Sequence, residues 1–450
     1  MGSEERHELC VIGAGTAGYA AAEAARDAGR DVVMIAGNDE LGGTCILRGC
    51  MPAKTVLAAA QYEGEVERAR SVGVETGQVH VDLPAIIRRK RALVDYFAAD
   101  RRHELSAYAL VRGDARFVAG DTIVAAGKRI RAERFVIATG AAIVPPRGIE
   151  LDGVPLVTSN DVLEMTHAPR RIAIAGGGPI GCAFAQFFAR LGTQVTLFQD
   201  APELLRNEDP DVGTAIRAVL QNEGVTVVCD ADLRSAVRAR ADVVLLAANR
   251  RPNVAGLDLA AAGIDGDTAR GILVDATLRS VSNPRVFAAG DVIGRRQLVH
   301  TAAYGGRLAA ANAFADPPIA AEWERWETHA VYTQPQIAVV GLDERACRAR
   351  GIEVDVATVP AAEVGKALVA GEAEGYVKML ARRDDGRVVG VTLVTDDAID
   401  LAGEAIALLD RGVTAREITA MPHLHPTMSE LLASAAERLL TQERKPARTI

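Results

Sequence analysis

The stretch LGGTCILRGCMPAK, residues 41–54, contains residues with the types and spacing that thiol redox chemistry needs. Cys45 and Cys50 are five positions apart, and Lys54 follows Cys50 by four. We predict that the cysteine pair lies at the start of a helix, on which Cys50 and Lys54 share a face. The positive end of the helix and the lysine would both stabilise a thiolate at this position. A disulfide that closes so small a loop would be strained and therefore reducible. The alternatives are two buried thiols or half of a zinc site, but no partner C-x-x-C follows, and the glycines and Pro52 frame a specific backbone shape.

Two segments have the strand, glycine turn and helix pattern of a dinucleotide-binding βαβ unit. In the first, the apolar strand HELCVI precedes the turn GAGTAG and an alanine-rich helix; in the second, RRIAIAG precedes GPIG, the helix CAFAQFFARLG and the strand QVTLF. Without side chains, the turn glycines let a pyrophosphate approach the helix N-terminus. One match alone is a weak signal, but its recurrence predicts two dinucleotide folds in one chain. The turn glycines are Gly13, Gly15 and Gly18 in the first fold, and Gly176, Gly178 and Gly181 in the second.

Two further strand ends carry residues that could contact a cofactor. RFVIATG places Thr139 and Gly140 at the end of a buried strand, and RVFAAGDV places Asp291 just beyond another. A carboxylate there can hold a hydroxyl of a bound cofactor, although a strand-to-helix cap is an open alternative. After about residue 320, strand-like runs such as GYVKMLARR and VVGVTLV alternate with the helical DLAGEAIALLDRG, which predicts a separate α+β domain.

The composition is that of a multidomain globular protein. The chain has 450 residues, of which 49% are hydrophobic and 4% aromatic, and its net charge is -8. Nucleic-acid binding relies on basic patches and aromatic stacking, so this class is disfavoured. No apolar run approaches the roughly 20 residues that span a bilayer, and the N-terminus lacks a basic, apolar signal region, so we expect no membrane contact and a cytoplasmic location. The remaining cysteines are interpreted as packing residues or incidental thiols: Cys10, Cys182, Cys229 and Cys347.

Seven motifs together resemble the flavoprotein (pyridine nucleotide-) disulfide oxidoreductase family, which includes glutathione reductase, dihydrolipoamide dehydrogenase and mercuric reductase. They follow one another in that family's order and cover nearly the whole chain: GAGTAG, GGTCILRGCMPAK, ATG, GGGPIG, RRPN, AAGDV and HLHPTMSE. The joint match is specific, although most members are individually weak.

The resemblance implies a role for each residue of the cysteine motif. Cys45 would be the interchange thiol that meets substrate, and Cys50 the thiol that lies against the flavin and relays electrons to it. Lys54 would lie near the flavin N5. The other implied FAD contacts are Gly13, Gly15, Gly18, Thr44, Thr139, Gly140 and Asp291, with Gly176, Gly178 and Gly181 at a pyridine nucleotide.

His425 and Glu430 in HPTMSE match the family's acid-base pair, in which the carboxylate orients the imidazole. Dithiol chemistry needs a thiolate, and a positioned histidine is the usual group that shuttles its proton near neutral pH. The alternatives are a histidine in a turn, or a metal-binding H-x-H formed with His423, for which the sequence shows no further ligand cluster. We therefore expect no metal site.

The implied fold is α/β, with two Rossmann-like domains, the second shortened, and a C-terminal α+β dimerisation domain. The FAD domain would comprise residues 1–142 and 268–318, the NAD(P)-type domain 143–267, and the interface domain 319–450. In this family, the C-terminal domain of one subunit completes the active site of the other. A homodimer is therefore expected, acting on a small-molecule or carrier-bound thiol or disulfide.

The sequence departs from the family pattern at the FAD ribose and beside the lysine. Ala36 stands where relatives end the second strand with an acidic residue that holds the ribose, a contact that Asp39 or Glu40 could take over. Ala183 stands where relatives carry the glutamate that pairs with the lysine, so we expect altered electrostatics at the flavin.

The second dinucleotide fold departs further. Gln199 replaces the glutamate that would bind a nicotinamide-nucleotide ribose, and Asp200 would repel a 2′-phosphate. Only about 25 residues separate Gly224 from Arg250, where relatives insert a strand meander roughly twice as long. We expect that NAD(P)H use is weakened or lost, and the choice between NADH and NADPH stays open.

Three functions are compatible with these residues. The first is an NAD(P)H-linked disulfide reductase or dihydrolipoamide-type dehydrogenase that uses FAD and the Cys45–Cys50 pair. The second is an FAD-dependent dithiol oxidase that passes electrons to oxygen or another acceptor. The third, a flavin-bound redox sensor, has little use for His425 and Glu430.

Overall fold

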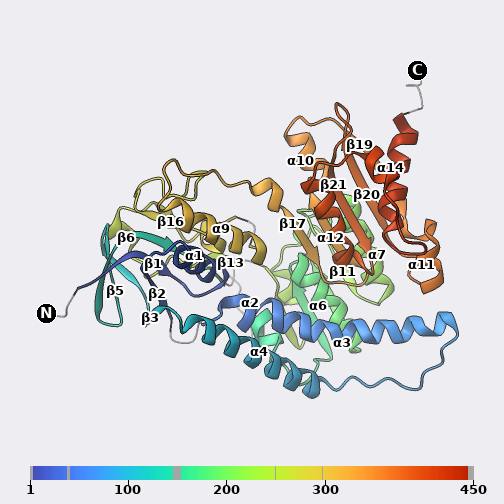
Figure 1. The fold of residues 1–450 in the computed structure, drawn as a ribbon. Helices are drawn as coiled ribbons and strands as arrows, with labels where there is room; N and C mark the ends of the chain where they lie inside the picture. The colour runs from blue at the N-terminus through green and yellow to red at the C-terminus, as the bar shows by residue number, and fades with distance from the viewer. Residues whose placement is uncertain (1–3, 38–40, 145–153, 249, 296, 444–450) are drawn as a thin grey trace. The chain divides into compact units, whose positions relative to one another are not determined.

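The computed structural model describes residues 4–37, 41–144, 154–248, 250–295 and 297–443. The chain divides into two compact units, which we describe separately (Figure 1). The first unit comprises residues 1–56, 85–148 and 249–323, and the second comprises 57–84, 149–248 and 324–450.

The first unit is built on a seven-stranded sheet of order β3-β2-β1-β6-β5-β4, in which β16 also pairs with β6. Its central strands are parallel, whereas β4, β5 and β6 form an antiparallel meander. β2 is buried along its whole length, as expected for a parallel sheet covered on both faces. The strands are β1 (Glu5–Ile12), β2 (Val32–Ala36), β3 (Ala109–Arg112), β4 (Arg116–Ala119), β5 (Thr122–Ala125), β6 (Lys128–Ile137) and β16 (Val286–Ala288).

Helices α1 and α9 pack closely together in this unit. Small residues allow the approach: a Cβ atom added at Gly306 would lie 2.1 Å from the carbonyl oxygen of Ala17. The remaining helices and strands of this unit lie around the sheet and are between two and 23 residues long. They are α1 (Thr16–Asp27), α2 (Gly43–Leu47), α4 (Leu83–Leu105), α9 (Val299–Asn312), β7 (Ala141–Ile143), β13 (Arg250–Pro252), β14 (Gly266–Asp267), β15 (Gly271–Ile272), η2 (Leu259–Ala262) and η3 (Gly290–Ile293).

The second unit contains a five-stranded parallel sheet of order β11-β10-β9-β12-β8. Between β11 and β12 the described residues form one short helix, α8, and no further strand. The second dinucleotide fold therefore has the shortened form that the sequence predicts. Its elements are β8 (Leu156–Thr158), α5 (Ser159–Val162), β9 (Arg171–Ala175), α6 (Pro179–Arg190), β10 (Gln194–Phe198), α7 (Pro210–Asn222), β11 (Thr226–Val228), α8 (Ser235–Arg238) and β12 (Val243–Leu246).

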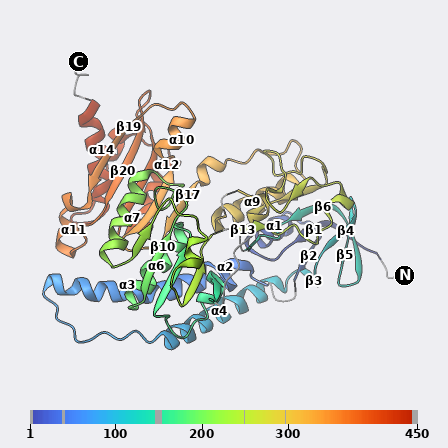
Figure 2. The same ribbon diagram turned by 180° about the vertical axis from the view of Figure 1, so that it is seen from behind.

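The C-terminal part of this unit is an antiparallel sheet of order β17-β18-β21-β20-β19, and helices α12 and α14 pack against it (Figure 2). Side chains alternate on β20: Val377 and Met379 join the core with the helices, whereas Lys378 points to the other face. The elements are β17 (Thr328–Val331), β18 (Gln336–Gly341), β19 (Val354–Pro360), β20 (Tyr376–Arg382), β21 (Val388–Thr395), α10 (Glu344–Ala349), α11 (Gly365–Ala370), α12 (Ala398–Asp410), α13 (Ala415–Ala420), α14 (Glu430–Glu443), η4 (Trp323–Trp326) and η5 (Ala361–Glu363).

The predicted fold class is confirmed: two α/β dinucleotide-type folds are followed by an α+β domain. The antiparallel meander of β4 and β5 and the long helix α4 have no counterpart in the sequence prediction. None of the described helices combines the length and the apolar character needed to cross a membrane.

Lys378 is buried in the second unit and forms ion pairs with three carboxylates. Its Nζ lies 2.6 Å from Asp209, 2.9 Å from Asp211 and 3.1 Å from Glu344. Burial lowers the pKa of Lys378, but its hydrogen bonds to Asp209 and Asp211 outweigh burial and raise the pKa above the usual range. The cluster joins the start of α7, in the second dinucleotide fold, to β20 and α10 of the C-terminal domain.

Replacing Lys378 by methionine is expected to destabilise the protein by about 3–5 kcal/mol, because Asp209 would remain buried without its cation. Urea unfolding, followed by circular dichroism, measures the loss. Lys128→Met, which removes an exposed ion pair with Glu5, is the control and should not shift the curve. A Lys378→Met curve that overlays the parent would contradict this role for the cluster.

Candidate active site

The turn between β1 and α1 has a backbone shape that excludes side chains. Gly13 has a φ of +116°, and a Cβ atom added there would lie 2.3 Å from the carbonyl oxygen of Ala138. A Cβ atom at Gly18 would lie 1.9 Å from the oxygen of Gly13. Gly15 is the N-cap of α1, whose first turn contains no acidic residue. The turn thus presents the positive end of a helix at a surface kept free of side chains, which suits a phosphate group.

The cysteine segment lies directly against this glycine turn. Gly43 has a φ of +68°, and a Cβ atom added there would lie 2.5 Å from the Cα of Gly15. Thr44 and Cys45 follow in the short helix α2, and α3 (Cys50–Ala69) begins at the second cysteine. The backbone contact between two glycines therefore brings both thiols next to the turn.

Cys45 and Cys50 are free, half-buried thiols whose sulfurs form a hydrogen bond with each other. This bond lowers the pKa of Cys50 to about 7; burial opposes the shift and the charge of Lys54 supports it. The pKa of Cys45 is raised, first by the same bond and then by burial. Burial lowers the pKa of Lys54, while the two nearby thiols act in the opposite direction. In the reduced pair, the negative charge is therefore favoured on Cys50 and the proton on Cys45.

Alkylation of Cys50 by iodoacetamide is expected to follow a pH profile with a midpoint at about pH 7, because only the thiolate reacts, whereas an ordinary thiol has its midpoint near about 8.5. Lys54→Met should move the midpoint upward, since a stabilising cation is lost. Mass spectrometry of the Cys50 peptide from reduced protein measures the rate. Lys366, a half-buried lysine of the second unit, provides the control variant Lys366→Met, which should leave the midpoint in place. Unchanged midpoints in both variants would show that Lys54 does not act on the thiol.

Asp291 and the ATG motif lie at strand ends of the same unit. Asp291 is half-buried directly after Gly290, and burial raises its pKa while the charge of Arg250 opposes the shift. Thr139 Oγ1 donates a 2.6 Å hydrogen bond to the carbonyl oxygen of Asn253, and Asn253 Nδ2 donates one of 3.0 Å to that of Thr139. The backbone N–H of Asn253 also donates to the oxygen of Gly140. Two motifs that are 114 positions apart, ATG and RRPN, are thus locked together.

Arg250 and Asn253 are site residues that the sequence prediction did not assign individually. RRPN was recognised only as a motif, and its spacing gives no sign that Asn253 pairs with Thr139 or that Arg250 acts on both Cys50 and Asp291. Ala36 ends β2 as expected, and Asp39 and Glu40 lie outside the described residues.

The second glycine turn, between β9 and α6, repeats the first. Gly176 has the same φ of +116° as Gly13, Gly178 is the N-cap of α6, and a Cβ atom at Gly181 would lie 1.8 Å from the oxygen of Gly176. Both turns therefore have the shape that a pyrophosphate requires.

The surroundings of the second turn differ from those of the first. Gln199 is buried directly after β10. Its Oε1 accepts a 2.9 Å hydrogen bond from the backbone N–H of Gly177, and its Nε2 donates to the backbone carbonyl oxygen of Glu203. The side-chain amide of Gln199 is thus hydrogen-bonded to the backbone of the turn itself. Asp200 is exposed beside Arg206, 3.3 Å away, and Ala183 is buried on α6.

His425 and Glu430 form a hydrogen-bonded pair before and at the start of α14. His425 Nδ1 lies 2.9 Å from Glu430 Oε1, and Glu430 Oε2 accepts a 2.9 Å bond from the N–H of Thr427. These two bonds, that from His425 first, lower the pKa of Glu430. The imidazole is 78% exposed, so its Nε2 edge is open to a reaction partner. The pair lies in the second unit, whereas Cys45 and Cys50 lie in the first.

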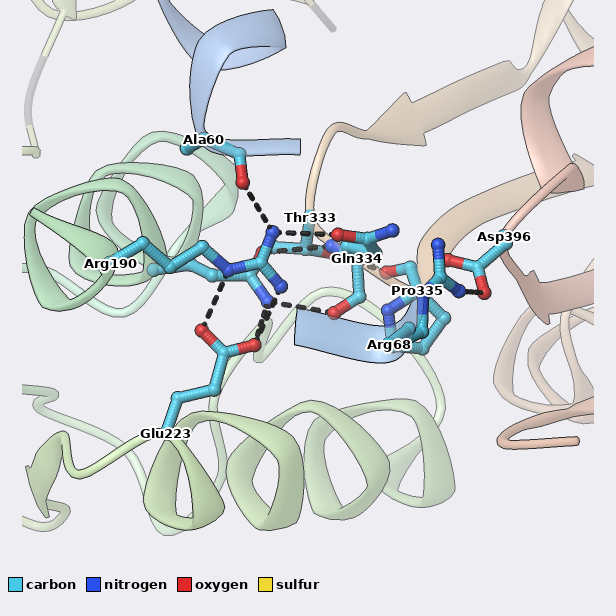
Figure 3. A network of polar contacts seen from close by, with 9 residues as sticks. Ala60, Arg68, Arg190, Glu223, Thr333, Gln334, Pro335 and Asp396 are labelled. Atoms are coloured by element: carbon cyan, nitrogen blue, oxygen red, sulfur yellow. Dashed lines mark hydrogen bonds and ion pairs between the residues drawn. The ribbon is translucent and has the colours of Figure 1, made fainter. Parts of the chain in front are cut away.

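The far half of the cysteine helix α3 belongs to the second unit and is anchored there by Arg190 (Figure 3). Arg190 Nη1 donates to the carbonyl oxygen of Ala60 on α3 (2.8 Å) and to Oε1 of Gln334 (2.6 Å), and the same guanidinium pairs with Glu223 at the end of α7 (2.7 Å). A Cβ atom added at Gly64 would lie 2.5 Å from this guanidinium, so the glycine makes room for it. A second ion pair joins Arg68 to Asp396. The helix that begins at Cys50 is therefore held at its other end by the second dinucleotide fold and the C-terminal domain.

Comparisons with known proteins cover both parts of the chain. Residues 7–306 match the model of the pyridine nucleotide-disulphide oxidoreductase family, and residues 328–436 match that of its dimerisation domain. The chain is 34% identical to a dihydrolipoyl dehydrogenase of Bacillus subtilis (strain 168), over 95% of this chain and 97% of that enzyme. It is 33% identical to a mercuric reductase of Streptomyces lividans, over 96% of each.

Solved structures agree with these matches. The flavoprotein disulfide reductase RclA from Escherichia coli, in a structure described as its Cu(II) complex, superposes with a TM-score of 0.84 at 25% identity, over 96% of this chain and 99% of that one. LpdA from Mycobacterium tuberculosis has the same fold, with a TM-score of 0.85 at 24% identity, over 97% of this chain and 99% of that one.

Proposed function

Because this chain belongs to the pyridine nucleotide-disulphide oxidoreductase family, we propose that its Cys45–Cys50 pair exchanges two electrons with a thiol or disulfide substrate, in a reaction that FAD links to NAD(P)H. One observation carries the proposal: two hydrogen-bonded thiols, one with a pKa near neutrality, lie against a glycine turn shaped for a dinucleotide. A dihydrolipoyl-type dithiol is the first substrate to test, since it is the one named for the relative from Bacillus subtilis.

The residues of the first unit fit FAD, the cofactor of this family. The turn of Gly13, Gly15 and Gly18 leaves no room for side chains and would receive the pyrophosphate. Asp291, half-buried with a raised pKa, has the carboxylate to accept a hydrogen bond from a cofactor hydroxyl, and Lys54 would lie beside the ring. When bound, FAD supplies the two-electron relay between the nicotinamide and the thiol pair.

The thiols carry out the exchange in two displacements. The sulfur of Cys45 gives up its proton and attacks a substrate disulfide RS–SR′, which forms a Cys45–SR bond and releases R′S⁻. The thiolate of Cys50 then attacks the sulfur of Cys45, closes the Cys45–Cys50 disulfide and releases RS⁻. The substrate is reduced by two electrons and the pair is oxidised by two. Of the two protons that the released thiolates take up, one comes from Cys45 and the other from solvent. The same steps in reverse oxidise a dithiol.

His425 is the proposed carrier of these protons. Its Nε2 edge is exposed, while Glu430 holds Nδ1 and so fixes the ring. The dimerisation domain supports a homodimer, and we propose that His425 of the partner subunit acts on Cys45. Each active site would then use residues of both chains.

NAD(P)H is proposed as the partner of the flavin because the glycine turn of the second fold keeps the backbone shape of the first. The expected affinity for NAD(P)H is weakened because the amide of Gln199 is already hydrogen-bonded to the turn, and because the described residues between β11 and β12 form no strand meander. The glycine turn itself is retained. Affinity for the nucleotide should therefore be modest.

Anaerobic titration tests this proposal. Dihydrolipoamide and NADH or NADPH should each bleach the yellow flavin absorbance of the purified protein, and the dithiol should reduce NAD⁺ or NADP⁺ in turnover. Bleaching by the dithiol but by neither nucleotide would exclude NAD(P)H and leave a dithiol oxidase. Bleaching by a nucleotide but by no dithiol or disulfide couple would overturn thiol exchange.

A further inference from the structure

A second histidine-carboxylate pair lies two residues before His425. His423 Nε2 lies 3.1 Å from Glu404 Oε1 on α12, and His423 Nδ1 lies 3.1 Å from the carbonyl oxygen of Met421. The side chain of His423 is only 9% exposed, against 78% for His425. The two histidines of the HLH motif therefore have opposite surroundings, one open and one enclosed.

Both groups that face His423 are hydrogen-bond acceptors. A neutral imidazole donates at one nitrogen and accepts at the other, so it can satisfy only one of them. A backbone carbonyl cannot donate, and neither can an ionised carboxylate. The imidazolium form donates at both nitrogens and satisfies both partners.

We infer that His423 is an imidazolium cation clamped between Glu404 and Met421, and that it positions the loop that carries His425. The inference rests on the proposed function, in which His425 carries protons. His423 itself touches no reacting atom; it is a positioning residue.

Before His425 the loop has few other ties to the body of the domain, whereas Met428, after His425, is buried in the core of the C-terminal domain. Met421 and Leu424 are exposed apolar residues, the latter at 80%, so burial does not hold them. The hydrogen bonds of Thr427 and His425 stay within the loop and the first residue of α14. Thr427 Oγ1 donates to the carbonyl oxygen of Leu424, and Glu430 accepts from His425 and Thr427. The pair of His423 and Glu404 reaches α12, which packs on the C-terminal sheet. Without this clamp, His425 would keep Glu430 and the anchor at Met428, but the segment before His425 would lose its tie to α12 and the imidazole would be less precisely placed.

The charge of His423 also acts on the His425–Glu430 pair. It lowers the pKa of Glu430, although the hydrogen bonds from His425 and Thr427 contribute more. A cation at this place favours the ionised carboxylate of Glu430, which is the form that orients the imidazole of His425.

The protonation state can be observed directly. Protein labelled with ¹⁵N in the histidine rings should show at pH 7 two protonated nitrogens for His423, a signal assigned by its absence in His423→Gln. In Glu404→Gln the amide carries no charge, and His423 should lose one of the two ring protons. A single protonated nitrogen in the parent protein would overturn the inference.

Kinetics tests the positioning role. His423→Gln should lower kcat for dihydrolipoamide oxidation about tenfold with little change in KM, and should leave reduction of ferricyanide by NAD(P)H intact, because that reaction bypasses the thiols. The matched control is His7→Gln, which removes the 2.9 Å pair of His7 with Asp31 in the first unit and should keep the parental kcat. A parental kcat in His423→Gln would remove the positioning role.

Failure of this inference differs from failure of the proposed function. If His425→Gln is inactive while His423→Gln is fully active, the positioning role of His423 is wrong and the proposed function still stands. If His425→Gln is fully active, the proposed function fails at its proton carrier, while the ring-nitrogen spectrum of His423 still decides its charge.

Discussion

Replacing Cys45 or Cys50 by serine is expected to lower turnover of a thiol or disulfide substrate by at least about 10⁴-fold, because a hydroxyl can neither attack a disulfide at neutral pH nor form one. Steady-state rates with dihydrolipoamide or lipoamide measure the loss. FAD content should stay at the parental level, since serine replaces the sulfur without filling the glycine turn. Cys229→Ser is the matched control: this thiol is also half-buried, but it lies in the second unit and contacts Arg217. It should keep full activity.

The two serine variants separate the halves of the reaction. If NAD(P)H reduces the flavin in the parent, it should still do so in both variants, because that step does not use the thiols. Substantial thiol turnover by either variant would show that the chemistry takes place elsewhere in the protein.

Replacing His425 by glutamine is expected to lower kcat by about 10²–10⁴-fold, the usual contribution of a positioned proton carrier. Glu430→Gln should cost less, because it removes the charge that orients the ring but leaves the ring in place. Stopped-flow reduction by the dithiol, followed through the flavin absorbance, assigns the loss to the thiol half of the reaction. His167→Gln, which changes an exposed histidine of the same unit, should behave as the parent.

Mixed dimers test whether the site is shared between subunits. A dimer of one Cys45→Ser chain and one His425→Gln chain contains one complete site if His425 serves the other chain's Cys45, and none if it serves its own. Mixing the two inactive variants under conditions of subunit exchange should therefore restore activity. Persistent inactivity of a verified mixed dimer would place both residues of one site in a single chain.

Particular residues show how far sequence reasoning reaches. Cys45, Cys50 and Lys54 occupy consecutive turns of the chain, so their spacing alone predicts that they meet, and α3 begins at Cys50 as expected. His425 and Glu430 are five positions apart, and a local turn suffices to join them. The glycines of the two turns were identified because their positions relative to the flanking strand and helix are fixed by local backbone geometry.

Other parts of the site have no local signal. His423 was considered with His425 as an H-x-H metal motif, and its ring instead faces Glu404, 19 positions earlier. Among the described side chains, no group of three or more histidine, cysteine, aspartate or glutamate residues could hold a metal ion. Gln199 was recognised as a substitution at a ribose position, but its bond to Gly177 could not be inferred, because it depends on how β10 lies beside the turn.

Local sequence is enough to predict the two glycine turns, the dithiol and the histidine-carboxylate pair, because each depends on residues a few positions apart whose geometry the backbone sets locally. Tertiary structure alone decided what surrounds them: the contact of Gly43 with Gly15, the anchoring of α3 by Arg190, and the burial of Lys378 beside Asp209, 169 positions away. Such partners meet only when sheets and helices pack. Folding as a whole offsets the entropy lost in closing the chain, so a hydrogen bond or an ion pair can then join residues at any sequence separation, and local sequence does not reveal the partner.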